Sequence, residues 1–159
     1  MISGAWSATI ERVQLLPEEL LSRSVGGEWS FIETLRHLIF VSDVWVRRTV
    51  LSTPSVYHRY GLPPDNDVDV LPWGIDVRAT PSFGEVLAVR DERMVQVGEV
   101  ISGLTTAEVA RICAQHPEPG FPAVTTFPVG FCLGIVIGEE WAHREYAERD
   151  LATLQTARD

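Results

Sequence analysis

The segment from Pro128 to about Thr156 constrains the fold of this chain more than any other. Its first part belongs to an apolar run over residues 127–137, and the segment turns strongly charged at Glu139 and Glu140. The apolar run is too short to span a bilayer and contains proline and glycine. The segment therefore predicts one long helix whose first half is buried in a protein core, and no membrane span.

Three other segments have helical periodicity. Ser30 and Glu33 have the spacing of a capping box, in which the serine side chain caps the helix and the glutamate reaches back to it. Ser82 and Glu85 repeat that spacing. We predict main helices over residues 3–16, 30–51, 82–102 and 128–156, with short helical turns near 17–21 and 105–108.

The remaining segments are connections rich in proline and glycine, and no segment shows the clean alternation of a strand. The chain is therefore predicted to be all-α: a single domain, residues 1–159, that forms a four-helix bundle with long crossover loops. Residues 52–81 are long for a connection, and they either cover a functional site or act as a passive crossover. Together with residues 115–127 they can frame the mouth of a pocket.

Charge and cysteine content narrow the function classes. The net charge of −9 argues against nucleic acid, whose phosphates are bound by clustered basic residues. Cys113 and Cys132 are the only cysteines, and the start of the chain does not look like a secretory signal. We therefore expect a reduced, soluble, cytoplasmic protein that acts on a small molecule, with no nucleic acid and no membrane as partner.

A carboxylate one helical turn before a histidine is the main chemical signal. Glu139 and His143 are at positions i and i+4, so both side chains project from one helix face. Glu140, three positions before His143, is the less favoured candidate for the carboxylate ligand. It is also a candidate for a residue that supports the ligands without binding the metal itself. His37, within the predicted second helix, is the candidate third ligand. A His/His/carboxylate set with open positions suits zinc, nickel or iron.

The same residues have a plainer interpretation. A Glu/His pair at i and i+4 is often a solvated pair on a helix surface, and a lone histidine in an apolar helix is usually a hydrogen-bonded core residue. Against this, Glu139 and His143 continue an apolar stripe or lie beside it, and polar groups there need partners. A metal ion would be one such partner.

Several other residues are assigned structural roles. His58 and His116 are predicted to be surface residues of loops. Trp29 is interpreted as packing next to the Ser30 cap, and residues 90–93 as the solvated face of the third helix. Cys132 is predicted to be a small core residue, so no catalytic nucleophile is assigned.

Residues 27–30 (Gly-Glu-Trp-Ser), 33–38 and 139–151 resemble the two signature helices of the DinB-like superfamily. This group includes YfiT-type metal-dependent hydrolases and the N-terminal domain of mycothiol-dependent maleylpyruvate isomerase. The resemblance implies a bundle of up-down-down-up order that holds a divalent metal through one residue of the second helix and two of the last. Those positions match His37, Glu139 and His143. Many members use three histidines, whereas the isomerase branch resembles the His/Glu/His set of this chain.

The resemblance also implies a function. We expect a metal-binding protein that is a metal-dependent enzyme, either a hydrolase or a transferase or isomerase that uses a low-molecular-weight thiol such as mycothiol. Homodimers are common in this group. The alternative, from another class, is a non-catalytic helical bundle that binds a small molecule or a protein partner.

Overall fold

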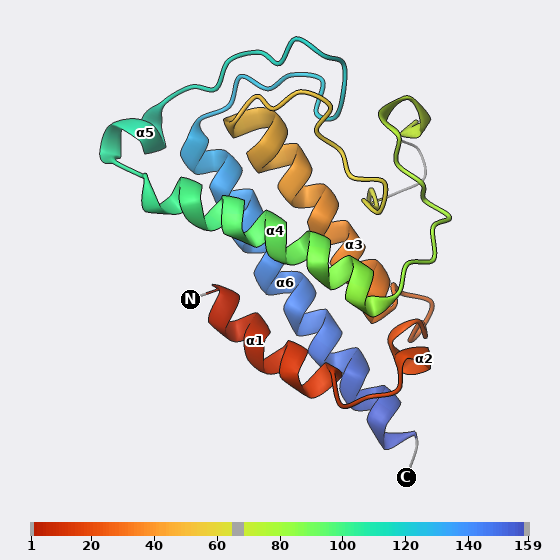
Figure 1. The fold of residues 1–159 in the computed structure, drawn as a ribbon. Coiled ribbons are helices and arrows are strands. Elements are labelled where there is room, and N and C mark those ends of the chain that lie inside the picture. The colour runs from red at the N-terminus through yellow and green to blue at the C-terminus, as the bar shows by residue number, and fades with distance from the viewer. Residues whose placement is uncertain (1, 65–68, 158–159) are drawn as a thin grey trace.

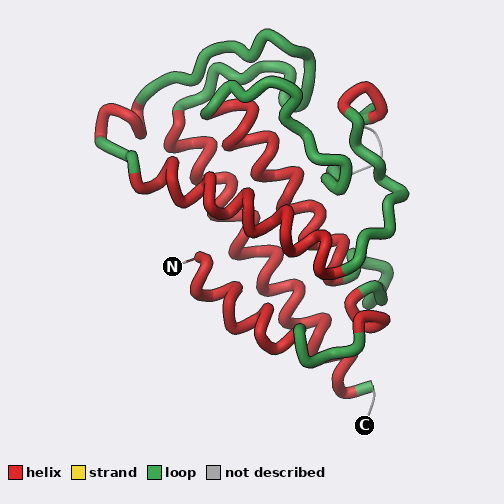
Figure 2. The backbone as a smooth tube through the Cα atoms, in the orientation of Figure 1, coloured by secondary structure: helices red, strands yellow, loops and turns green. Residues whose placement is uncertain are grey.

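Helices make up all the regular secondary structure of the described residues. The structure is a computed structural model that describes residues 2–64 and 69–157. The elements are α1 (Ile2–Val13), α2 (Glu18–Leu21), α3 (Phe31–Ser42), the π-helix η1 (Asp43–Val50), the 3₁₀-helix η2 (Leu71–Trp73), α4 (Phe83–Ser102), α5 (Thr106–Ala110) and α6 (Val129–Thr156). Figures 1 and 2 show helices joined by loops, which confirms the all-α prediction for this part of the chain.

The predicted second helix forms, but it changes its winding halfway. It starts with the predicted capping box: Glu33 N–H donates to Ser30 Oγ at 3.2 Å, and the Glu33 carboxylate accepts from Ser30 N–H at 2.8 Å. From Asp43 onward the helix is wider. The Leu51 N–H donates to the carbonyl of Val46, five residues earlier, at 2.9 Å. Such wider turns are rare and occur frequently at functional sites.

α3 lies at the centre of the packing. It contacts both α4 and α6, and Figure 1 shows α3 and α6 side by side and running in opposite directions. α1 packs on α6, where the Arg144 side chain donates to the carbonyl of Ala5 at 3.0 Å. Two apolar clusters form the core of this packing. One contains Leu35, Leu38, Val86 and Leu151, and the other contains Val46, Val97, Cys132 and Val136.

A polar layer separates the two apolar clusters. It contains two arginines of residues 90–93, and the prediction that these residues form a solvated face is wrong for both arginines. Arg90 and Arg93 are 3% and 4% exposed, so residues 90–93 are not simply a solvated face. Arg90 donates to both carboxylate oxygens of Glu140, at 2.9 and 2.5 Å, and Arg93 Nε donates to Asp43 at 2.7 Å. The two arginines share the inward face of α4 with valines one turn before and after them, so burial requires charged partners.

The first crossover, residues 51–82, is fastened to α3 by a buried arginine. The Arg36 guanidinium donates to the carbonyls of Tyr60, Asp76 and Ala79 at 2.9, 2.8 and 2.7 Å. Backbone carbonyls far apart in the loop thus share one side chain, which holds the loop against the helix. Residues 65–68 of this connection lie outside the described residues.

The second crossover, residues 111–128, is fastened in a similar way by Arg48. This side chain donates to His116 Nδ1 at 3.0 Å and to the Glu118 carbonyl at 2.8 Å. Because His116 Nδ1 accepts, the proton is on Nε2, which donates to the Thr53 carbonyl at 2.9 Å. His116 is 4% exposed, so the prediction of a surface histidine is wrong.

In the part of the chain that is described, no helix combines the length and the apolar character needed to cross a membrane.

Candidate metal centre

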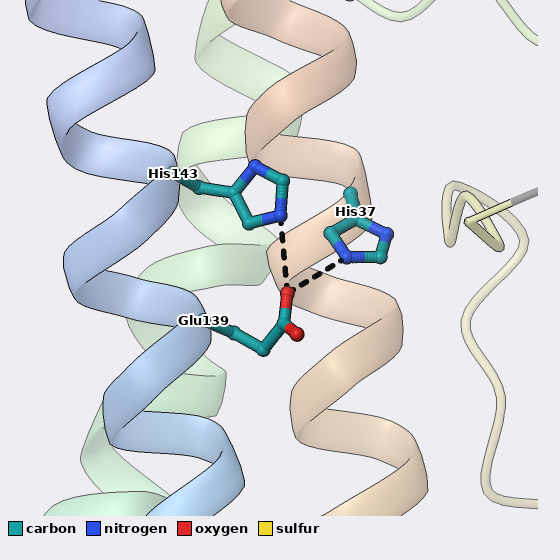
Figure 3. Close-up of side chains that lie close together, drawn as sticks. All are labelled: His37, Glu139 and His143. Carbon is teal, nitrogen blue, oxygen red and sulfur yellow. Dashed lines mark hydrogen bonds and ion pairs between the residues drawn. The ribbon is translucent and has the colours of Figure 1, made fainter.

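Two helices bring one carboxylate and two imidazoles together. His37 comes from α3, and Glu139 and His143 come from consecutive turns of α6. Figure 3 shows the Glu139 carboxylate directed between the two rings. Glu139 Oε2 is 3.3 Å from His37 Nε2 and 3.0 Å from His143 Nε2. One ligand atom from each residue lies within 4.8 Å of the others.

The three side chains of the group differ in their exposure to solvent. His37 is 5% exposed, while the side chains of Glu139 and His143 are 37% and 16% exposed. Among the described side chains, this is the one group of three or more His, Cys, Asp or Glu residues close enough to hold a metal ion. The structure therefore brings together the three residues that the spacing and the resemblance indicate as ligands.

The first crossover orients the His37 ring. His37 Nδ1 lies 2.9 Å from the carbonyl of Leu62, and the Leu62 N–H donates to the Arg36 carbonyl at 3.2 Å. Since a carbonyl only accepts, Nδ1 carries a proton. In the neutral ring Nε2 then presents its lone pair to the other two residues. A histidine ligand is commonly fixed by such a bond from its second nitrogen.

The electrostatics of the group favour a cation at its centre. Burial lowers the pKa of His37, and the nearby His143 lowers it further, although the Leu62 carbonyl and Glu139 act in the opposite direction. The neutral form of His37 is thus favoured, and its Nε2 lone pair faces a carboxylate oxygen. Two acceptors that face each other repel, and a cation between them removes the repulsion. The donor set therefore fits a divalent metal ion.

A cavity of about 390 Å³ adjoins the three residues. Pro64 of the first crossover and Phe121 of the second both line it, so the two crossovers do frame this pocket. The other lining residues come from the loop before α3, from α3 and η1, and from α6. They are Trp29, His37, Phe40, Val41, Trp45, Ile135, Glu139 and His143.

A comparison with protein families identifies the chain at this point. The model of the DinB superfamily matches residues 1–147, which is most of the chain. The chain belongs to the DinB superfamily. A search of curated proteins and a search of solved structures each found no match.

Trp29 belongs to the site of this DinB-superfamily chain, although the sequence suggested only a packing role. Its ring centroid lies 4.6 Å from that of His37 and 5.8 Å from that of His143. One indole thus contacts both imidazoles and limits their rotation. The sequence did contain a signal for this role of Trp29, because Trp29 lies in residues 27–30, which are part of the resemblance to the superfamily.

The two neighbouring glutamates of α6 have different surroundings. Glu139 contacts both histidines, whereas Glu140 is fully buried and pairs with Arg90 on α4. Glu140, and not Glu139, continues the inward stripe of Val136 and Ala147. Glu140 therefore lies outside the histidine group, and its contacts are with α4.

Proposed function

We propose that this member of the DinB superfamily binds zinc, nickel or iron through His37, Glu139 and His143 and is a metal-dependent enzyme acting on a small molecule. The observation that carries the proposal is the convergence of three ligand atoms beside a cavity, with the His37 ring held by Leu62. In this proposal the long helices form the up-down-down-up bundle expected for the superfamily.

When bound, a divalent metal can lower the pKa of a water molecule or stabilise a thiolate. The chain supplies the ligands and keeps His37 in the tautomer that binds. Beyond the three ligands, no ionisable side chain of the described residues lines the cavity. In this proposal the attacking group is a water or an added thiol. These two options correspond to a hydrolase and to a transferase or isomerase that uses a thiol such as mycothiol.

Metal analysis tests the ligand assignment. Protein prepared without a metal-binding tag is expected to contain close to one equivalent of zinc, nickel or iron. The His37→Ala variant should lose this metal and stay folded, as judged by circular dichroism. His58→Ala is the matched control, because His58 lies outside the group and should leave metal content unchanged. Equal metal content in His37→Ala and the wild type would remove His37 from the ligands.

A second experiment separates the function classes. The metal-loaded protein is assayed against small esters and amides without thiol, and against electrophiles with mycothiol, bacillithiol or glutathione. Turnover without thiol supports a hydrolase, and turnover only with thiol supports a transferase or isomerase. Metal binding with no turnover in either assay favours the alternative of a non-catalytic binding protein.

A further inference from the structure

The walls of the cavity are apolar except at the three ligand residues. They combine four aromatic side chains and an isoleucine with smaller apolar groups, and no arginine is among them. The 13 lysine and arginine residues of the chain are all arginines, so the chain contains no lysine. The wall side chains outside the ligand group are Trp29, Phe40, Val41, Trp45, Pro64, Phe121 and Ile135.

We propose that the substrate of this site has an uncharged aromatic or otherwise apolar body and one polar group, which faces His37, Glu139 and His143. This inference rests on the proposed function and names its substrate class. The apolar body gains by leaving water, in proportion to the area it buries. An anionic group on this body would lose its hydration with no arginine on the described walls to pair with it.

Phe121 is the wall residue that the second crossover contributes, and its backbone is held on both sides by one hydroxyl. Tyr57 Oη donates to the Phe121 carbonyl at 3.0 Å and accepts from the Phe121 N–H at 2.8 Å. The rings of Phe121 and Phe40 stack with centroids 6.2 Å apart, and Phe40 in turn stacks on Tyr57 at 6.1 Å. Tyr57 is therefore a positioning residue for the aromatic wall.

The residue before Phe121 shows how closely the loop approaches its anchor. A Cβ atom on Gly120 would lie 2.6 Å from Tyr57 Oη and 2.7 Å from Arg48 Cζ. Only glycine lets the backbone pass this close without moving the tyrosine or the arginine. The position of Phe121 is thus set by the buried Arg48 and by Tyr57 together, so the wall is preformed.

Hydroxamates test the substrate class, because they share one metal-binding head and differ in their bodies. Binding of acetohydroxamate, benzohydroxamate and 4-carboxybenzohydroxamate to the metal-loaded protein is measured by calorimetry. Benzohydroxamate is expected to bind at least about 30-fold tighter than acetohydroxamate, because its ring is buried. The added carboxylate should weaken binding by about 100-fold, because it has no cationic partner. Equal affinities of the three probes, or tighter binding of the carboxylate, would overturn the proposal.

Two variants locate the effect in the cavity. Ile135→Trp fills the cavity and should abolish benzohydroxamate binding while the metal is retained. Tyr57→Phe releases the Phe121 backbone and should reduce the preference for benzohydroxamate over acetohydroxamate about 3- to 10-fold, with acetohydroxamate affinity unchanged. A preference that survives both substitutions would show that the ring binds elsewhere and would refute the assignment.

Indole, which has no metal-binding head, separates this inference from the proposed function. Its binding to metal-free protein is measured by ligand-observed NMR, with Ile135→Trp as the control that should lose it. Indole binding without uptake of any metal would contradict the proposed function and leave the apolar cavity supported. Metal uptake without indole binding would support the metal site and contradict the substrate class.

Discussion

At the scale of single residues, neighbours in sequence have different roles because they lie on different sides of a helix. Glu139 and Glu140 are adjacent, yet one contacts two histidines and the other pairs with Arg90 on α4. Arg36 and His37 are adjacent as well, and both bind the first crossover. Arg36 holds its carbonyls, and His37 is oriented by Leu62.

Substitution of Glu140 should affect stability and leave metal binding intact. Glu140→Gln is expected to lower the free energy of unfolding by about 3–5 kcal/mol, because it leaves the Arg90 charge buried without a counter-charge. Urea denaturation measures the loss, and metal content should stay at the wild-type level. The double variant Arg90→Met/Glu140→Leu should recover most of the stability. A Glu140→Gln protein that is fully stable but metal-free would reverse the roles assigned to the two glutamates.

Cys132 makes the fold sensitive to alkaline pH. Burial, with a further contribution from nearby Cys113, raises the pKa of the Cys132 thiol from 9.0 to about 12. Between these values the unfolded chain loses the proton and the native state keeps it, so stability falls as pH rises and is unaffected below pH 9. The free energy of unfolding, measured near pH 8 and near pH 11, should fall less in Cys132→Ala than in the wild type. Parallel pH dependence in both proteins would show that Cys132 does not contribute.

At the scale of elements, two buried arginines attach the crossovers to the helices, one from α3 and one from η1. Arg36 and Arg48 each donate to backbone carbonyls of a connection that has little regular structure of its own. Loops held in this way bring Pro64 and Phe121 to the cavity. The sequence showed these connections to be long and rich in breakers, but only the folded chain shows what holds them.

Loss of the Arg36 anchor should expose the first crossover to protease. Trypsin cleaves after arginine, and the exposed residues Arg59 and Arg78 lie next to carbonyls that Arg36 holds, those of Tyr60 and Ala79. Arg36→Met keeps the side-chain volume but removes every donor, so cleavage after Arg59 and Arg78 should become at least about 10-fold faster by local opening. Cleavage after Arg23, in a different exposed segment, serves as the internal control. Equal acceleration at all three sites would indicate global unfolding instead.

At the scale of the whole molecule, polar contacts join the same helices that the apolar clusters pack together. The pairs Arg90–Glu140 and Arg93–Asp43 attach α4 to α6 and to η1, and the His37, Glu139 and His143 group joins α3 to α6. Because that group spans two helices that are distant in sequence, a metal bound there stabilises the native state and not the unfolded chain.

Added metal is therefore expected to raise the melting temperature. At a free metal concentration of 100 times Kd the stabilisation is about 2.7 kcal/mol. For a chain of this size that corresponds to a shift of about 5–10 °C. Thermal unfolding of metal-free protein with added zinc, nickel or iron measures it. His37→Ala should show no shift, and a shift of equal size in that variant would place the stabilising metal elsewhere.

The sequence by itself determined the local features of this protein. The capping boxes at Ser30 and Ser82 indicated where two helices begin, and the spacing of Glu139 and His143 put both on one face of α6. These features depend on backbone geometry within one or two turns, so a single chain segment contains the information. Membership of the DinB superfamily was likewise recognisable from two short segments.

The tertiary structure alone decided which of these features meet. His37 and Glu139 are 102 positions apart in the sequence, and Arg90 and Glu140 are 50 positions apart. No local pattern specifies such pairs, because they depend on how helices dock. For the same reason the burial of Arg90, Arg93 and His116 was not predicted. Helix periodicity shows which side chains share a face, but it does not show what covers that face.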